Sequence, residues 1–229
     1  MKIHPVQVSL FLSTLSLFLF FGFSTAINEI SDGYEKKIQE VRAEEGQAKL
    51  RLARVRDTIT SLRSKRDSLE VIAEAERRPE ILWTARALYS ETKRAHEMRF
   101  VAWVIRNRYD VRHRGASSYR SVVLDHKQFS AFNRGSAKRG FYLSLEPKHS
   151  GQVPRWHTAL ATAKSVIDAP EEKRPFSLST LFFYSQRSMD GQPHWESSMR
   201  EVALGSVNSH RFRFLQKSNI TGYDSHRSR

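Results

Sequence analysis

The stretch Glu80-Ile-Leu-Trp-Thr-Ala-Arg-Ala-Leu-Tyr-Ser-Glu91 decides the fold of the second half of the chain. Pro79 comes just before it, where the first turn of a helix tolerates a missing N–H. The apolar residues recur at the spacing of one helical face, at Ile81, Ala85, Leu88 and Tyr89. The pattern predicts an amphipathic helix that packs against a core and ends at Glu91.

Glu91 is expected at the edge of the buried face, in the last turn of this helix. Partial burial disfavours the charged form of a carboxylate, and so does the negative end of a helix dipole. Both effects raise the pKa of a carboxyl group. A carboxylic acid that keeps its proton near neutral pH suits general acid catalysis. The alternative interpretation is a solvated glutamate at the end of a helix.

The charge balance of the 229-residue chain is strongly basic, with 38 Lys and Arg against 24 Asp and Glu and a net charge of +14. A chain of this length forms one or two domains. The positive charge favours polyanionic partners: nucleic acid, anionic lipid or an acidic cell-wall polymer. The chain has no cysteine, which excludes disulfides and thiolate metal sites.

Residues 1–26 have the composition of an export signal. Lys2 gives a weakly positive start, the segment from Val8 to Phe23 is rich in Leu and Phe, and Ser24-Thr25-Ala26 supplies small residues for cleavage. We expect a cleaved signal peptide, with an uncleaved membrane anchor as the alternative because the apolar segment is long. In both cases the rest of the chain is exported to the periplasm, the cell wall or the medium, so no nucleic-acid partner is expected.

Residues 34–76 predict a long polar helix, and we place a coiled-coil segment at 27–78. Positions that alternate steps of four and three are apolar or aromatic, except for Glu45 and Arg66. We call this set the seam: Tyr34, Ile38, Val41, Glu45, Ala48, Leu52, Val55, Ile59, Leu62, Arg66, Leu69 and Ala73. Its partner would be a second chain, another protein or the following domain folding back. A lone solvated helix is the alternative.

A compact domain is expected at 79–216. A polar connector at 93–97 should lead to a helix with an apolar centre at Phe100–Ile105, ending near Tyr109. Further predictions are a short helix at 118–124, long loops at 125–151, a helix at 156–167 and strands at 181–184 and 210–215. The last strand alternates apolar and basic residues, as an edge strand would. The predicted fold class is mainly α with a small antiparallel sheet (α+β), followed by a disordered basic tail at 217–229.

A series of short motifs runs through residues 80–215. They are Leu88-Tyr89-Ser90-Glu91, Asn107-Arg108, Gln128-Phe129-Ser130, the helix that begins at Trp156, Phe183-Tyr184, His194-Trp195 and Ser209-His210-Arg211-Phe212. Their order resembles the cell-wall hydrolase family of the spore-cortex-lytic enzymes. The resemblance implies a lysozyme-like catalytic domain that cuts the glycan strands of peptidoglycan as a lytic transglycosylase. It also implies that Glu91 is the catalytic glutamate and that the Gln-Phe-Ser motif falls on residues 128–130.

The implied mechanism needs one acid. Glu91 would protonate the oxygen that leaves N-acetylmuramic acid, through an oxocarbenium-like state. Its carboxylate would then take the proton of the sugar's own 6-hydroxyl, which gives a 1,6-anhydro end. Glu97 and Asp125 are candidates for a second carboxylate in a hydrolytic mechanism, although a surface role is commoner for either. No cofactor is expected.

The substrate-binding candidates each have a structural alternative. Tyr184 could donate a hydrogen bond to the sugar or to Glu91, or be a buried tyrosine with a satisfied hydroxyl. Gln128 could bind an N-acetyl group through its amide or stabilise a turn. Phe129 and Trp195 could stack on sugar faces or pack in the core. The complete set is Tyr89, Gln128, Phe129, Ser130, Tyr184, Trp195 and His210.

The histidines do not indicate a metal site, because no helical H-E-x-x-H pattern occurs and no carboxylate is spaced to complete one. A basic run comprises Arg106, Arg108, Arg112, His113 and Arg114. It could hold anionic peptide stems or face solvent. Two other functions remain open: a non-catalytic module that binds wall glycan, and a basic coiled-coil scaffold or nucleic-acid binder.

Overall fold

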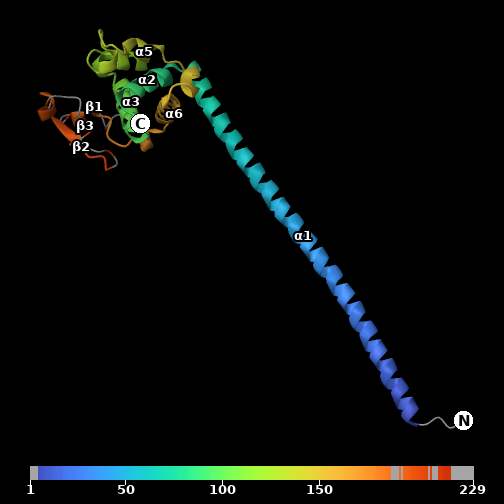
Figure 1. Cartoon of the computed structure of the whole chain (residues 1–229). Helices are drawn as coiled ribbons and strands as arrows, with labels where there is room; N and C mark the ends of the chain where they lie inside the picture. Colours follow the sequence, from blue (N-terminus) through green and yellow to red (C-terminus); the bar gives the residue numbers. More distant parts are fainter. Residues whose placement is uncertain (1–4, 187–190, 192, 206, 208–210, 218–229) are drawn as a thin grey trace, which may run out of the picture. The chain divides into compact units, whose positions relative to one another are not determined.

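The computed structural model describes residues 5–186, 191, 193–205, 207 and 211–217. The chain divides into two compact units, Met1–Ser64 and Lys65–Arg229, which we describe separately. The first consists of most of a single long helix, α1 (Pro5–Arg77), whose last turns belong to the second (Figure 1). Within the described residues, no helix contains a stretch that is both long and apolar enough to cross a membrane.

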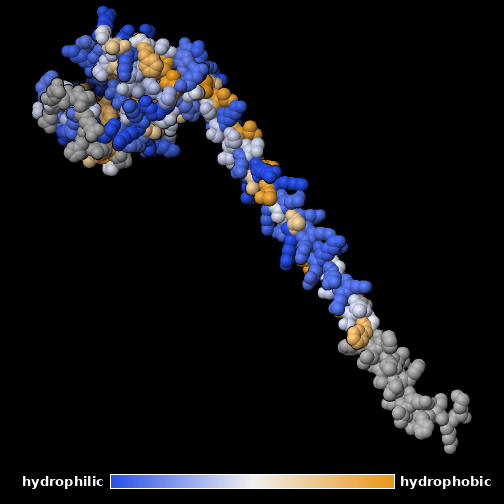
Figure 2. Space-filling model, in the orientation of Figure 1, coloured by the Kyte–Doolittle hydropathy of each residue, from blue (hydrophilic) through white to orange (hydrophobic). Residues whose placement is uncertain are grey.

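Helix α1 begins well before the predicted start at residue 34, because no proline interrupts residues 6–77. Its predicted seam lies open to solvent, with exposed fractions of 52% for Leu52 and 60% for Leu62. Figure 2 shows hydrophobic side chains interspersed among hydrophilic ones along this helix. In the part of α1 that belongs to the second unit, Leu69 is also 57% exposed.

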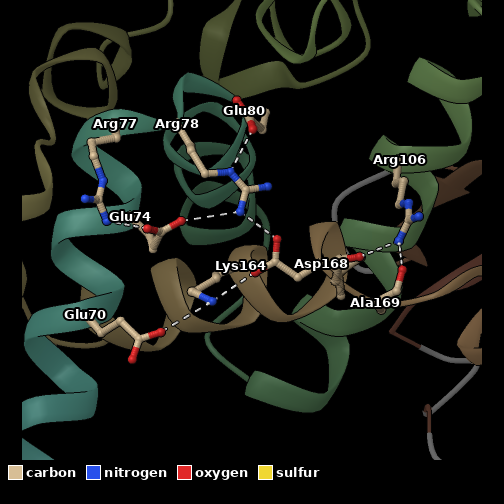
Figure 3. Close-up of polar contacts among 10 residues, drawn as sticks. Glu70, Glu74, Arg77, Arg78, Glu80, Arg106, Lys164, Asp168 and Ala169 are labelled. Carbon is tan, nitrogen blue, oxygen red and sulfur yellow. Dashed lines mark hydrogen bonds and ion pairs between the residues drawn. The ribbon is translucent and has the colours of Figure 1, made fainter.

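The last turns of α1, which belong to the second unit, pack against the rest of that unit through residues outside the predicted seam. Ala75 is buried in the core and Val71 packs against it, whereas the seam runs through Leu69 and Ala73. The rest of the second unit therefore leaves the seam residue Leu69 exposed and covers Ala73 only in part. Arg78 reinforces the contact, because its guanidinium bonds Glu80 and Asp168 (Figure 3).

Four helices build the core of the second unit. They are α2 (Pro79–Glu91), α3 (Ala95–Asp110), α4 (Tyr119–Leu124) and α6 (Trp156–Ile167). Ser118 caps α4 by accepting a hydrogen bond from the backbone N–H of Ser121. Trp103 and Trp156 are the largest fully buried side chains. The predicted helices at 80–91, 118–124 and 156–167 are confirmed, and the predicted apolar centre of α3 at Phe100–Ile105 is buried.

The predicted polar connector at 93–97 was too long, because α3 already begins at Ala95. Glu97 lies in the first turn of α3, where the helix dipole favours an acidic side chain. Its side chain is completely buried instead of solvated. The polar residues of this stretch therefore predicted a solvated connector where the chain forms the first turn of a helix.

The segment 125–151 contains short helices where long loops were predicted. They are η2 (Ser130–Phe132), α5 (Arg139–Ser144) and η3 (Pro147–Gly151). Contacts from distant helices hold this segment: Arg86 donates twice to the Leu145 carbonyl, at 3.1 and 2.9 Å, and the Trp156 indole donates to the Glu146 carbonyl at 2.7 Å. Three more short turns are η1 (His113–Gly115), η4 (Glu171–Lys173) and η6 (Glu196–Ser198).

A three-stranded antiparallel sheet follows the helices. It comprises β1 (Thr180–Tyr184), β2 (Met199–Val202) and β3 (Arg213–Lys217), in the order β1-β3-β2 (Figure 1). Strand β3, which was predicted to be an edge strand, is therefore the central strand, because it pairs with β1 on one side and with β2 on the other. Its basic residue Arg213 is not solvated but bonds Glu196 and Glu201. Of the predicted tail, Lys217 ends β3 and the remainder lies outside the described residues.

The end of α3 ties the sheet to the helices. The Asn107 amide donates to the carbonyls of Ser177 and Thr180, both at 3.0 Å, and Arg108 Nε donates to the Leu181 carbonyl at 2.7 Å. The predicted class, mainly helical with a small antiparallel sheet, is confirmed.

Candidate active site

A cleft of about 740 Å³ opens at the end of α2. The helix buries Ala87 and Leu88 completely, so that Glu91 comes to lie at the rim of its packed face. The backbone becomes extended at Thr92, whose N–H closes the helix on the Leu88 carbonyl at 3.2 Å. The residues that line the cleft are Tyr89, Ser90, Glu91, Thr92, Lys93, Lys138, Phe141, Tyr142, Arg155 and Arg211.

Glu91 combines partial exposure to the cleft with an unusual protonation equilibrium. Burial of its carboxyl raises the pKa to about 7, against the opposing charge of Arg108. At neutral pH both forms are therefore populated. A group with these properties can give a proton and later accept one.

Arg108 is a buried cation that acts on Glu91. Burial lowers its pKa to about 10, while the carboxylates of Asp125 and Glu91 oppose this shift. Its guanidinium faces the ring of Phe129 at 5.5 Å, and its Nη1 has no hydrogen-bond partner among the described residues. Arg108 thus remains charged at neutral pH and favours the carboxylate form of Glu91 once the proton has left.

Glu97 is an internal anchor and not a second acid in the cleft. It accepts hydrogen bonds from the Thr92 hydroxyl and, at 3.1 Å, from Arg211 Nε. Both donors line the cleft, so Glu97 joins the end of α2 to the segment that precedes β3. The other sequence candidate, Asp125, pairs with Arg114 at 3.1 Å and is not among the described residues that line the cleft.

An aromatic wall forms one side of the cleft. The rings of Phe141 and Tyr142 lie with their centroids 6.3 Å from that of Tyr89, and Trp156 lies behind at 5.8 Å. Phe141 is 47% exposed although it is large and apolar. Exposed rings beside polar groups are the surfaces on which sugar faces stack. Tyr89 thus lies where the sequence placed it, beside Glu91.

The Gln-Phe-Ser motif lies away from the cleft lining. Phe129 is 1% exposed and packs against Phe183, with ring centroids 6.0 Å apart. Gln128 is half-buried, and its backbone N–H donates to the Asp125 carbonyl in a turn. Ser130 is exposed at the start of η2. The structure therefore shows a core position for Phe129 and a turn at Gln128.

Tyr184 and Trp195 belong to a second cluster on the sheet. The Tyr184 hydroxyl donates to Glu196 at 2.6 Å and accepts from Arg213 at 3.3 Å, so its polar end is satisfied there. Trp195 packs edge-on against Tyr184, at 5.9 Å between centroids. Neither is among the described residues that line the cleft around Glu91. His210 lies outside the described residues.

The basic run 106–114 does not form one anion-binding surface. Arg106 donates to the carbonyls of Val166 and Ala169, at 2.7 and 2.6 Å, and Arg108 is buried. Figure 3 shows the Arg106 side chain directed to the C-terminal end of α6 and Ala169. Among the described residues, no group of three or more His, Asp or Glu side chains is placed to hold a metal ion.

Comparison with known families identifies the domain that contains this cleft. The family model described as Cell Wall Hydrolase matches residues 92–213, which is more than half of the chain. The chain belongs to the cell wall hydrolase family. The match confirms the expected cell wall hydrolase family, and the relation to the spore-cortex-lytic enzymes stays a prediction. A wall or extracellular location agrees with this family. No curated protein and no solved structure matches the chain.

The match to the cell wall hydrolases spans the Gln-Phe-Ser motif, α6, β1 and β2. It begins one residue after Glu91 and ends at Arg213, the first residue of β3. A hydrolase domain of this family acts on peptidoglycan. Glu91 itself stands outside the matched range.

Several residues that line the cleft of this cell wall hydrolase carry no signal in the sequence. Lys138 and Arg155 lie in segments with no recognisable motif. Arg211 lies within the motif Ser209-His210-Arg211-Phe212, which gives no indication of a role for its guanidinium. Only the adjacent aromatics Phe141 and Tyr142, within a stretch rich in Gly, Ser and Lys, could have suggested a sugar-binding surface.

Proposed function

We propose that the chain is an exported enzyme that cuts the glycan strand of peptidoglycan between N-acetylmuramic acid and N-acetylglucosamine, with Glu91 as general acid and base. The observation that carries the proposal is a half-buried carboxyl with a pKa of about 7 that faces an open cleft in a cell wall hydrolase domain. The aromatic wall beside it supports a sugar substrate.

The chemistry requires two proton transfers, one from Glu91 and one back to it. Protonated Glu91 gives its proton to the bridging oxygen, the bond from that oxygen to C1 of N-acetylmuramic acid breaks, and N-acetylglucosamine leaves as an alcohol. The Glu91 carboxylate, favoured by buried Arg108, then takes the proton of the 6-hydroxyl as its oxygen bonds to C1. The products are a 1,6-anhydro end and a regenerated acid.

The composition of the cleft favours this route over hydrolysis. Glu91 is the one carboxylate among the described residues that line the cleft. Glycosidases that use water or a covalent intermediate place two carboxylates across the scissile bond. Glu97, the nearest alternative in sequence, is buried and occupied by Thr92 and Arg211. A lytic transglycosylase needs no second carboxylate.

Mass spectrometry of digested sacculi tests the proposal. The wild-type chain should release fragments with 1,6-anhydro ends, and Glu91→Gln should release none while still binding sacculi. Glu171→Gln, an exposed glutamate on η4 outside the cleft, is the matched control and should act as the wild type. Reducing ends would show hydrolysis instead. Binding without products from the wild type would favour the non-catalytic wall-binding module.

Export and domain organisation are part of the same proposal. We propose that residues 1–26 are a signal peptide, that 27–78 form the coiled-coil segment and that 79–216 form the catalytic domain. The last turns of α1 join this domain, because Val71 and Ala75 pack against its core. Mass measurement of the exported protein tests the first part: cleavage predicts a chain that begins at Ile27.

The open seam of α1 supports a partner helix. Its exposed residues, including Val41, Leu52 and Leu62, form a stripe that isolated helices rarely leave in water. We infer that another helix, from a second copy or from a partner protein, covers this stripe.

A further inference from the structure

The cleft around Glu91 carries an excess of positive charge that the proposed cleavage does not use. Lys93, Lys138, Arg155 and Arg211 all line it, against Glu91 as the one carboxylate among the described lining residues. They come from four separate parts of the chain: the connector after α2, the residue before α5, the residue before α6 and the segment before β3. The fold therefore gathers these charges at one place.

Two of the four cations are held in position. Glu97 fixes Arg211 by accepting from its Nε at 3.1 Å, and Glu97 is itself completely buried. A buried carboxylate is retained only where its partners are well placed. Arg155 lies over the ring of Tyr89, with its guanidinium carbon 5.4 Å from the ring centroid. A held guanidinium presents its remaining N–H donors in a fixed fork that suits a carboxylate.

The sugar backbone of peptidoglycan gives no reason for such charge. Its hydroxyl and N-acetyl groups are neutral and are bound by neutral donors and aromatic rings. The carboxylates of this polymer belong to the peptide stems on the lactyl groups of N-acetylmuramic acid. A cleft with four cations and an aromatic wall thus offers one surface for the sugars and another for the stems.

We propose that Lys93, Lys138, Arg155 and Arg211 bind the carboxylates of the peptide stem, so that the enzyme selects stem-bearing glycan over glycan stripped of its stems. This inference rests on the proposed function, since it concerns the substrate of the same cleft. From the sequence, the basic run 106–114 was a candidate for the site that binds anionic stems. The inference assigns this role to the cleft instead. Stem selection would confine cutting to wall that still carries its peptides.

The test compares two substrates prepared from one batch of sacculi. One is left intact, and the other is stripped of stems with an amidase that cuts the bond between the lactyl group and the first amino acid. The lactyl carboxylate that this hydrolysis frees is then converted to its neutral methyl amide, so that the stripped strand carries no anion. The wild-type chain should cut intact sacculi about tenfold faster, because each partly exposed charge pair contributes a few-fold and the contributions of separate cations multiply. The ratio of the two rates should shrink as salt is raised.

Variants locate the effect. In the double variant Lys138→Gln with Arg155→Gln, the ratio of rates on intact and stripped substrate should fall toward one. A ratio is chosen because partial unfolding lowers both rates together. The single variant Lys138→Gln, at an exposed lysine, gives the same direction with a smaller change and little risk to folding. Lys173→Gln, an exposed lysine on η4, is the matched control and should keep the wild-type ratio.

Three outcomes would overturn the inference: equal rates on both substrates, faster cutting of stripped strands, or a double variant with the wild-type ratio. Failure of the proposed function looks different, because the wild type would then release no fragments from either substrate. In that case, retention of the Glu91→Gln chain on intact and on stripped sacculi still tests the inference. Equal retention contradicts stem binding, and preferential retention on intact sacculi supports it.

Discussion

Glu91 is set between two opposing influences. Burial destabilises its charged form and raises its pKa. The positive charge of buried Arg108 stabilises the charged form and lowers the pKa, but burial has the larger effect. A carboxyl buried without the cation would hold its proton too firmly to act as a base in the second step. A solvated carboxyl would already have lost its proton at neutral pH. The balance leaves a group that can serve in both directions.

The first prediction concerns the pH dependence of cleavage. Because Glu91 must carry a proton to donate it to the bridging oxygen and its pKa is about 7, kcat/KM should fall above pH 7, by about tenfold per pH unit. Turbidity loss of sacculi, measured between pH 5 and 9 in buffers of constant ionic strength, gives the profile. Activity that stays level up to pH 9 would contradict the assignment of Glu91 as the acid.

The second prediction concerns folding stability. The pKa of Glu91 rises from an ordinary 4.5 to about 7 on folding, so the folded state binds the proton more tightly. Stability is therefore lost as the pH rises from about 4.5 through 7, and the full penalty applies above that. Glu91→Gln removes this penalty and should stabilise the chain at pH 8 by about 2 kcal/mol, after allowance for solvent in the cleft, with little effect at pH 4. Urea unfolding at the two pH values measures the difference, and Glu171→Gln should show none.

At the scale of elements, the junction of α1 with α2 and α6 is a network of charges (Figure 3). Arg78 bonds Asp168 at 2.6 Å and Glu80 at 2.9 Å, and Lys164 bonds Asp168 at 2.9 Å. Burial alone would raise the pKa of Asp168, but hydrogen bonds from Lys164 and Arg78 bring it below its usual value. The end of α1 is thus fastened to the catalytic body by more than apolar contact.

The third prediction tests that fastening. Arg78→Ala should cost about 1–2 kcal/mol of unfolding free energy, since it leaves Asp168 and Glu80 without a shared partner. Amide hydrogen exchange at residues 65–78 should become faster. Because Asp168 has a lowered pKa, this cost should be present above the ordinary aspartate pKa of about 3.9 and shrink as the pH falls below it. Arg77→Ala, whose described partner is Glu74 alone, is the control; an equal loss there would contradict the role given to Arg78.

The accuracy of the sequence predictions differs between elements for physical reasons. Helix α6 was placed correctly because its apolar period and the following Pro170 are local signals. Strand β3 was taken for an edge strand because its basic residue looked solvated, yet Glu196 and Glu201 neutralise Arg213 from segments that carried no strand signal. The local sequence pattern therefore predicts where a helix or strand lies. Which strands pair with it depends on contacts between residues far apart in the sequence.

The same distinction holds for the site. The position of Glu91 at the rim of a packed helix face could be predicted, because the apolar residues that set this face lie in one short stretch. The aromatic position of Phe129 was visible too, but its place in the core depends on contact with Phe183, far along the chain. The cations Arg155 and Arg211 approach Glu91 only after the fold is complete, so no spacing in the sequence could indicate them.

At the scale of the whole molecule, the chain combines a catalytic body with a helix whose apolar seam is exposed. Leu52 and Ile59, which hold the same core position in two successive heptads, are 52% and 42% exposed. Covering a large aliphatic side chain contributes about 1.5–3 kcal/mol, so a seam of this length can hold two helices together. Leu50 is also apolar and 62% exposed, but it lies on the opposite side of the heptad.

The fourth prediction is that the chain from Ile27 onward self-associates through the seam. Sedimentation equilibrium over a hundredfold range of concentration should show an oligomer that dissociates on dilution. Leu52→Asp with Ile59→Asp should give a monomer, because each charge would be buried without a partner in the associated state. Leu50→Asp introduces the same charge outside the seam and should leave the oligomer intact. A wild-type chain that is monomeric throughout would contradict self-association and assign the seam to a helix of another protein. Since none of Leu50, Leu52 and Ile59 is among the described residues that line the cleft, none of these variants should change the rate of cleavage per cleft on soluble glycan fragments.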